Sequence, residues 1–498
     1  MNPAGHRRRL RDATRLTLWM LVPFAAMGLM CLAWGSNSAS TMLRTRRHVL
    51  LVTVDALRAD YLSANGYDLP TSPVMDSLLH GGTSFTHAIT TIARTTQALT
   101  SLLTGTYPQT NGVRRLDDTL RSDIVSLPAL ARARGYATVA VVSNPILAPE
   151  RGLTRGFEVY DVASDGRDAA QTTATALRYL QRYGPEDAVF AWVHYVDPHV
   201  PYDPGPELAT QFDPGYDGPY QLHFGEHGGD LGDGAFPPQL PKEVAVYRNP
   251  LSDKVNAHIR RLYAADVRNA DDGITALLEG LHHALGDDWL VVLTADHGES
   301  LGEHQYFFDH GDYVSDVELH VPLAFVFASG DPLQGSRSVP TWVSLVDVMP
   351  TLIDLLDLHP TEAARNQFDG RSLLPALRGQ PLSDRPVFAE CGEAFYPPFV
   401  RRRTLFNDLG GRFRTVILDD LKLVWTPGLP SSTAYELYFL ASDPGESNDL
   451  YQQASSAPEV DHLRAALDDW YERGMTGTPS QQITEADHER LRTLGYVN

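Results

Sequence analysis

Cysteine is nearly absent from this sequence: only Cys31 and Cys391 occur among its 498 residues. Two cysteines, the first of them in an apolar segment, are too few for a disulfide framework, a cysteine-rich zinc site or a paired redox motif. Internal repeats and low-complexity tracts are also absent. The content of 43% hydrophobic and 21% charged residues is that of an ordinary globular protein, and the length allows one large core or two domains.

Positive charge is scarce as well. Lysine and arginine number 41 against 62 aspartates and glutamates, which gives a formal net charge of -21. Because so acidic a chain repels polyanions, nucleic acid is not expected as the main partner. An anionic substrate would need local positive charge from a metal ion and from His, Lys or Arg side chains.

The N-terminal segment predicts contact with a membrane. Residues 1–15 are basic and include five arginines, and residues 16–35 are uncharged and mostly apolar. Twenty such residues reach about 30 Å as a helix, enough to span the hydrocarbon layer. A basic flank keeps the N-terminus cytoplasmic, so the rest of the chain is expected to be extracytoplasmic, in the periplasm or outside the cell. The alternative is a cleaved signal peptide and a secreted protein, since Ser38-Ala39-Ser40 offers small residues.

Two domains are predicted beyond this segment. Residues 46–380 alternate between buried strands and helices, which predicts an α/β domain with a large, mostly parallel sheet flanked by helices. Residues 385–498 contain short strands separated by turns and a closing helix, which predicts a small α+β subdomain with an antiparallel sheet. From Asp203 to Pro250 the sequence is rich in Gly, Pro and Asp and has no clear periodicity, so we expect a lid or a substrate-selecting insertion there.

Acidic and imidazole side chains follow two of the apolar strands. The run Trp289 to Leu293 leads to Asp296-His297-Gly298, and the run after His48 ends in Asp55. In open α/β sheets ligands bind at the carboxyl edge of the strands, and a carboxylate beside an imidazole suits a cation such as zinc or manganese. A turn with a satisfied histidine, and a helix N-cap at Asp55, are the structural alternatives.

A threonine near a helix start supplies a candidate nucleophile. The helix expected from Thr96 onward ends at Gly105, which places Thr95 near the N-cap, where free backbone N–H groups favour a tetrahedral anion. A cap without chemistry is the alternative. If Thr95 joined Asp55, Asp296 and His297 around one divalent cation, the metal would lower the pKa of the hydroxyl and make it a nucleophile.

A third apolar strand, beginning at Val189, continues into His194-Tyr-Val-Asp197-Pro-His199. Histidines and an aspartate beside prolines suit a rigid loop that faces a substrate, and a solvated turn is the alternative.

Several motifs together resemble one family. They are Val52 to Asp60, Thr95 ten residues before Gly105, His194 to His199, Asp296 to His304, and His310-Gly311. The pattern resembles the sulfatase family of the alkaline phosphatase superfamily, from about His48 to the C-terminus. The resemblance implies that Asp55, Asp296 and His297 bind one divalent metal ion (Ca, Mn, Zn or Mg) with Thr95, the covalent nucleophile. It also implies that His199 and His310 bind the anion of the substrate and assist the leaving oxygen, with His304 and Lys422 as further candidates for the same pocket.

The chain departs from the sulfatase pattern at the nucleophile. It has Thr95, Gln97 and Leu99 where that family has a Cys or Ser converted to formylglycine, then Pro or Ala, then Arg. Threonine cannot be oxidised to an aldehyde, so the expected mechanism is independent of formylglycine. Threonine is instead similar to the nucleophile of the superfamily's phosphodiesterases and phosphotransferases. Ala56 replaces an acidic residue, and Asp197 and His199 lack the four-residue spacing of a second site, so one metal is expected.

These observations predict a metal-dependent, sulfatase-like hydrolase of sulfate or phosphate esters. The substrate would be a sulfated or phosphorylated glycan, lipid or small molecule. One alternative is a membrane-anchored phosphotransferase that resembles the phosphoethanolamine transferases or lipoteichoic-acid synthases. Another is an inactive sulfatase-like binding module, against which the retention of all the ligand-type residues weighs.

Overall fold

The computed structural model describes residues 48–116, 118–164, 166–225, 251–392, 412–427, 430 and 433–475. The predicted basic segment 1–15 and membrane segment 16–35 lie outside the described residues. Across the ranges just given, no helix combines the length and the apolar character that a bilayer crossing requires.

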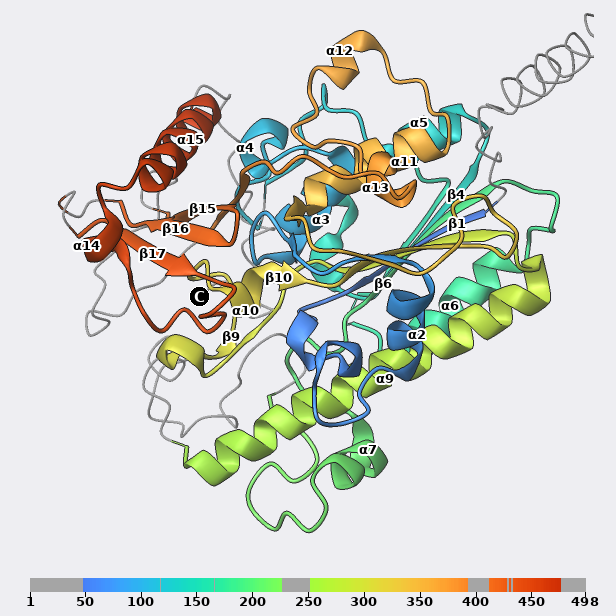
Figure 1. Cartoon of the computed structure of the whole chain (residues 1–498). Helices are drawn as coiled ribbons and strands as arrows, with labels where there is room; N and C mark the ends of the chain where they lie inside the picture. Colours follow the sequence, from blue (N-terminus) through green and yellow to red (C-terminus); the bar gives the residue numbers. More distant parts are fainter. Residues whose placement is uncertain are drawn as a thin grey trace, which may run out of the picture. The chain divides into compact units, whose positions relative to one another are not determined.

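A mixed sheet of eight strands forms the centre of the structure (Figure 1). Its strands, in spatial order, are β12 (Arg337–Val339), β2 (Thr83–Phe85), β11 (Leu323–Phe327), β7 (Trp289–Ala295), β1 (His48–Val54), β6 (Val189–Tyr195), β4 (Ala137–Val142) and β5 (Val159–Val162). Strand β11 runs antiparallel to both of its neighbours, and the other pairings are parallel. The predicted α/β fold with a large, mostly parallel sheet is therefore confirmed.

The three central strands are in register at their carboxyl ends. Val54, the last residue of β1, pairs with Tyr195 of β6 on one side and with Ala295 of β7 on the other. All three strands are buried along their whole length, as expected for parallel strands covered on both faces. Their common register brings the residues that follow them to one level of the sheet edge.

Helices cover both faces of this sheet. Figure 1 shows α6 (Ala169–Leu180) and α9 (Asp253–Leu285) along one face, and α3 (Thr95–Thr104), α5 (Leu127–Ala133) and α11 (Val348–Leu355) on the other. Helix α9 begins after Ser252, whose hydroxyl accepts a hydrogen bond from the Val255 N–H and caps the helix.

The remaining elements of the larger domain are short. They are α2 (Pro73–Gly81), β3 (Ala88–Ile89), α4 (Pro108–Asn111), β8 (Ser300–Leu301), β9 (Phe307–Asp309), α10 (Asp316–Leu319), β10 (His320–Val321), β13 (Val343–Ser344), α12 (Glu362–Arg365) and α13 (Leu374–Leu377). Strands β10, β3 and β13 form a small three-stranded sheet, and β8 pairs with β9.

The C-terminal part forms a separate antiparallel sheet, as predicted. It consists of β14 (Val387–Glu390), β15 (Arg414–Leu418), β16 (Leu421–Trp425) and β17 (Tyr435–Phe439), with α14 (Tyr451–Ala454) and α15 (Pro458–Met475) after it. Apolar residues of α15 pack on this sheet and bury it; they are Val460, Leu463, Leu467 and Trp470. Backbone N–H groups of Glu390 and Gly392 donate to the carbonyls of Thr91 and Gly311 and so join the sheet to the larger domain.

Part of the predicted insertion is folded. Helix α7 (Gly205–Phe212) lies in it, although the sequence shows no clear periodicity there, and residues 226–250 lie outside the described part of the chain. His258 of α9 holds this segment: its Nδ1 lies 2.6 Å from Asp213 Oδ2, and its Nε2 lies 2.9 Å from the Tyr220 carbonyl oxygen. The imidazole also stacks on Tyr216 with 3.5 Å between ring centroids.

A buried carboxylate in the small sheet gives a testable prediction of stability. Glu390 is fully buried and accepts two hydrogen bonds from Arg114, at 3.1 and 2.8 Å, with Arg412 and Arg414 also within 3.5 Å. Burial alone would raise the pKa of Glu390, but the three guanidinium groups lower it from 4.5 to about 2. Since this pKa is lower in the folded than in the unfolded chain, the carboxylate stabilises the fold fully above about pH 4.5, and the stabilisation is lost as the pH falls toward 2.

Glu390→Gln is therefore expected to lower the free energy of unfolding at pH 7 by roughly 3 kcal/mol. The free energy of unfolding of the variant should also fall less on acidification than that of the unchanged protein. Chemical denaturation at a series of pH values measures both effects. Asp123→Asn is the control, because Asp123 pairs with Arg121 on the surface, and its change is expected to stay within about 0.5 kcal/mol. A Glu390→Gln protein as stable as the unchanged protein would contradict the prediction.

Candidate active site

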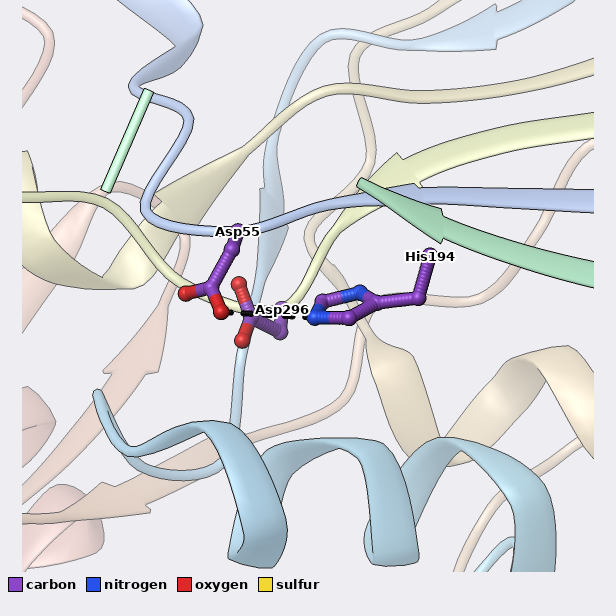
Figure 2. A group of neighbouring side chains, drawn as sticks. All are labelled: Asp55, His194 and Asp296. Carbon is purple, nitrogen blue, oxygen red and sulfur yellow. Dashed lines mark hydrogen bonds and ion pairs between the residues drawn. The ribbon is translucent and has the colours of Figure 1, made fainter. Parts of the chain in front are cut away.

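Three neighbouring strands bring three metal-ligand side chains to one point. Asp55 follows β1, Asp296 follows β7, and His194 is the penultimate residue of β6. One ligand atom from each lies within 4.8 Å of the others, and all three residues are buried. Figure 2 shows the two carboxylates close together and the edge of the His194 ring directed at them. The dashed line there joins Asp55 Oδ2 to His194 Nε2, which are 3.3 Å apart.

The other carboxylate oxygen of Asp55 faces the remaining predicted residues. The Thr95 hydroxyl lies 3.4 Å from Asp55 Oδ1 and 3.4 Å from His297 Nε2. His297 Nε2 is also 3.6 Å from Asp55 Oδ1 and 3.5 Å from Asp296 Oδ2. The structure therefore gathers all four predicted metal-site residues, Asp55, Thr95, Asp296 and His297, around one point.

Local backbone geometry fixes the orientation of Asp296. Ala56 adopts a left-handed conformation with φ of 54°, and its N–H donates to Asp296 Oδ1 at 3.1 Å. The His297 N–H donates to the same oxygen at 2.8 Å. Asp296 Oδ2 is buried and has no hydrogen-bond partner among the residues that the structure describes. A buried carboxylate oxygen without a partner is costly, and a bound cation would satisfy it.

The tautomer of His297 also suits a ligand. Its Nδ1 lies 2.8 Å from the Gly298 carbonyl oxygen, which can only accept, so Nδ1 carries the proton. Nε2 then presents its lone pair toward Asp55, Asp296 and Thr95. Burial is the main cause, and the nearby His310 the second, that hold the pKa of His297 well below its usual range. The imidazole therefore stays neutral.

The two carboxylates oppose each other electrostatically. Burial and the charge of Asp55 raise the pKa of Asp296 well above its usual range. Burial would also raise the pKa of Asp55, but His199, His194 and His297 lower it below its usual range. A divalent cation between the carboxylates would replace this repulsion by attraction. The oxygen and imidazole donors present fit such an ion, with Zn and Mn best matched to the mixed set.

Thr95 is the first residue of α3 and is 3% exposed. The helix ends at Gly105, with φ of 65°, as the sequence predicts. The residue before Thr95, Arg94, is extended, and its guanidinium pairs with Asp312 at 3.1 Å. Because the first turn of a helix leaves backbone N–H groups without partners inside the helix, an anion is favoured at this end of α3.

His199 and His310 lie next to this group. The ring centroid of His310 is 4.2 Å from that of His297 and 5.1 Å from that of His199. His199 Nδ1 lies 2.7 Å from the Val200 carbonyl oxygen and therefore donates to it. His199 Nε2 is buried and has no hydrogen-bond partner within the described part of the chain. The two histidines are thus placed to contact a substrate held near Thr95.

The other two predicted substrate-binding residues have different neighbours. The Lys422 ammonium group donates to the Val314 carbonyl oxygen at 2.5 Å and forms an ion pair with Glu446. His304 Nε2 lies 3.8 Å from the same glutamate. The contacts described for His304 and Lys422 join them to each other through Glu446 and do not join them to Asp55 or Thr95.

Asn144 and Glu299 were not predicted as members of the site, and His194 was expected only as part of a loop that faces a substrate. His194 and Asn144 both contact Asp55 Oδ2, the latter donating from Nδ2 at 2.7 Å. Glu299 contacts His310 Nδ1 at 2.9 Å. Each left a trace in the sequence, because His194 is a polar residue in an apolar strand, Asn144 closely follows β4, and Glu299 belongs to the Asp296-His297-Gly-Glu motif.

Comparisons with known proteins show the family and the fold of the chain. The sequence model of the sulfatase family matches residues 47–358. Iduronate 2-sulfatase of Mus musculus is 23% identical over 558 aligned positions, covering 90% of this chain and 98% of that protein.

Two solved structures share the fold. The phosphonate monoester hydrolase of Agrobacterium radiobacter superposes with a TM-score of 0.67 at 22% identity, covering 88% of this chain and 100% of that chain. The protein BT4656, solved with its substrate D-glucosamine-2-N,6-O-disulfate, also gives a TM-score of 0.67, at 18% identity, covering 87% of this chain and 99% of that chain. With the family match extending over more than half of its length, the chain belongs to the sulfatase family, within the alkaline phosphatase-like superfamily.

Proposed function

We propose that this protein is a metal-dependent hydrolase of sulfate or phosphate esters in which Thr95 is the nucleophile. The observation that carries the proposal is the position of the Thr95 hydroxyl, 3.4 Å from both Asp55 Oδ1 and His297 Nε2 at the start of α3. Relatives that include a sulfatase and a phosphonate monoester hydrolase support ester hydrolysis as the reaction class.

Asp55, Asp296, His297 and Thr95 would hold the metal, which would supply Lewis acidity that lowers the pKa of the bound hydroxyl. Asp55 Oδ1, which accepts the hydrogen bond of the Thr95 hydroxyl, would take the Thr95 proton. The free N–H groups of the first turn of α3 would bind oxygens of the ester group, and His310 would bind another.

The reaction would then proceed in two displacements. Thr95 Oγ attacks the phosphorus or sulfur atom as its proton passes to Asp55 Oδ1, and the bond to the ester oxygen breaks. His199, with a proton on both ring nitrogens, keeps Nδ1–H on the Val200 carbonyl oxygen and delivers the Nε2 proton to the leaving oxygen. Water next attacks the central atom of the threonine ester and gives a proton to His199 Nε2, while Asp55 Oδ1 returns its proton to Thr95 Oγ as the bond to threonine breaks and the inorganic anion is released. Each step forms one bond to the phosphorus or sulfur atom and breaks another.

The threonine favours phosphate over sulfate. In a formylglycine sulfatase the hydrated aldehyde has a second hydroxyl that expels sulfate, and threonine has only one oxygen. Release from Thr95 therefore requires attack by water on the central atom, which is the ordinary second step of phosphoryl transfer. We therefore expect phosphate esters to turn over faster than sulfate esters.

A mass-spectrometric search for a covalent adduct tests the assignment. The protein is incubated with p-nitrophenyl phosphate and p-nitrophenyl sulfate and quenched in acid. The expected result is a phosphorylated or sulfated peptide with the group on Thr95. Turnover with an adduct on another residue would overturn the choice of nucleophile.

A phosphotransferase is the second candidate, favoured by the combination of Thr95 with the predicted membrane segment 16–35. It would use the same threonine ester and pass the phosphoryl group to an alcohol in place of water. Product analysis with and without glycerol as acceptor distinguishes the two. Phosphorylated glycerol as the main product would favour the transferase.

His310→Ala is expected to weaken anion binding more than metal binding. Loss of one hydrogen bond to a charged group costs about 1.5 to 3 kcal/mol, so the inhibition constant of inorganic phosphate should rise by roughly 10- to 100-fold. Metal content, measured by inductively coupled plasma mass spectrometry, should stay unchanged. His304→Ala is the matched control, because that ring lies near Glu446. Equal losses of phosphate affinity and metal content in His310→Ala would indicate that His310 is a metal ligand.

A further inference from the structure

A buried glutamate contacts the outer nitrogen of a site histidine. Glu299 is fully buried, and its Oε1 lies 2.9 Å from His310 Nδ1. The other carboxylate oxygen, Oε2, accepts a hydrogen bond from the Tyr202 hydroxyl at 3.1 Å. Both oxygens of Glu299 are therefore engaged, one by the histidine and one by the tyrosine.

This contact fixes the ring of His310. With Nδ1 held by Glu299, Nε2 is the nitrogen left to face the site, whose nearest rings are those of His297 and His199. A carboxylate that holds one nitrogen of an imidazole sets both the orientation and the tautomer of the ring. His199 and His297 have the same arrangement, but with backbone carbonyls as the partners of Nδ1.

The backbone of Glu299 is itself held in place. Its carbonyl oxygen accepts from Arg58 Nη1 at 3.2 Å, and the preceding N–H, of Gly298, donates to the Glu318 carbonyl oxygen at 2.8 Å. A side chain at Gly298 would collide with the Val317 carbonyl oxygen, because its Cβ would lie only 2.1 Å away. The glutamate therefore has little freedom to move away from His310.

Tyr202 extends the chain of contacts to the segment that carries α7. Its backbone exchanges two hydrogen bonds with Phe224, at 2.8 and 2.9 Å, across the base of that segment. Its buried ring contacts those of Tyr263 and Phe308. The hydroxyl of Tyr202 is thus delivered to Glu299 by a well-packed element.

We propose that Glu299 is a positioning residue for the reaction, acting through His310, and that Tyr202 orients Glu299 from the base of the α7 segment. The inference rests on the proposed function for the role of His310 toward the substrate. A structural role alone is poorly served by a carboxylate here. Among the residues that the structure describes, its hydrogen-bond partners are a hydroxyl and an imidazole, and a buried carboxylate with so few partners destabilises the fold.

The kinetic test is a double-mutant cycle with p-nitrophenyl phosphate and p-nitrophenyl sulfate. Glu299→Gln is expected to lower kcat by roughly 10- to 100-fold, as for loss of an outer partner of a ligating or reacting histidine. In the His310→Ala protein the same change should have no further effect, since Glu299 acts only through that ring. Multiplicative losses would overturn the proposal.

Glu318→Gln is the matched control. Glu318 is equally buried, and its Oε2 accepts from the Gly311 N–H, one residue from His310, without a described contact to the ring. Glu318→Gln should change kcat by the same factor in the unchanged protein and in the His310→Ala protein. Tyr202→Phe should reproduce part of the Glu299→Gln loss, and a Tyr202→Phe protein with unchanged kcat would remove Tyr202 from the proposal.

A second measurement does not depend on turnover. In protein labelled with ¹⁵N-histidine, the His310 ring nitrogen signals, assigned by their loss in His310→Ala, should shift in Glu299→Gln and stay in place in Glu318→Gln. Unshifted signals in Glu299→Gln would overturn the positioning role. A shift in a protein that forms no Thr95 adduct would instead count against the proposed function and leave the contact between Glu299 and His310 established.

Discussion

Replacing Thr95 by alanine is expected to abolish turnover, with kcat lower by about 10^4-fold or more, because no other group can take the place of an in-line nucleophile. The fold should be unchanged, since the hydroxyl of this residue contacts only Asp55 and His297 in the described structure. The two carboxylates and the imidazole remain, so metal should stay bound. Steady-state kinetics, circular dichroism and metal analysis on the same preparation measure the three outcomes.

Two further variants sharpen this experiment. Thr95→Ser keeps the attacking oxygen and is expected to retain activity within about tenfold. Thr100→Ala removes a hydroxyl from the same helix that donates only to the Thr96 carbonyl oxygen, so its activity should stay within a few-fold. Undiminished turnover of both aryl esters by Thr95→Ala would eliminate this residue as the nucleophile.

The position of the site could be predicted because strand ends obey a simple rule. Asp55 and Asp296 each follow a fully buried apolar strand, and parallel strands in register bring such residues to one edge. The sequence predicts a helix from Thr96 that ends at Gly105, with Thr95 near its start. The structure has this helix as α3, Thr95–Thr104. These inferences use only local pattern and the polarity of the sheet.

The contacts that His194 and Asn144 make with Asp55 could not be predicted without information about the strand order. His194 lies inside β6, one residue before its end, and pairs in register with Thr53, so only the strand order brings it to Asp55. The Thr53 hydroxyl lies 2.9 Å from His194 Nδ1, which directs the other ring nitrogen toward the site. Asn144 follows β4, two strands from β1, and its reach to Asp55 depends on the same order.

His304 and His310 could not be separated by sequence because both follow the Asp296 motif at short distances. Left-handed residues at 304, 305 and 308 fold this stretch back as the β8–β9 pair, which returns His310 to the site. Lys422 lies on β16, opposite Tyr438, and its direction follows from the register of the small sheet. Both outcomes depend on contacts that no local pattern encodes.

Asp296→Asn is expected to remove the bound metal and, with it, the activity. The change replaces a charged ligand by a neutral one at the oxygen that has no other partner in the described structure, so affinity for the ion should fall by roughly 100-fold or more. Metal analysis gives the stoichiometry, which should be one divalent ion in the unchanged protein. Chelation followed by addition of Ca, Mn, Zn or Mg identifies the ion that restores turnover.

The Asp296→Asn variant should be at least as stable as the parent protein without metal and less stable than the parent when metal is present. Without metal, burial and Asp55 make the Asp296 carboxylate unfavourable, so the free energy of unfolding of Asp296→Asn should equal or exceed that of the metal-free parent. An ion at 100 times its dissociation constant should stabilise the parent by about 2.7 kcal/mol and the variant far less.

Asp271→Asn is the control for this experiment, because Asp271 is also buried but accepts from the Val74 and Met75 N–H groups at the start of α2. Asp271→Asn should keep the metal-dependent gain in stability. A parent protein that hydrolyses esters without a divalent ion would contradict the metal site. A parent that is folded, metal-free and inactive would instead favour a binding module built on the sulfatase fold.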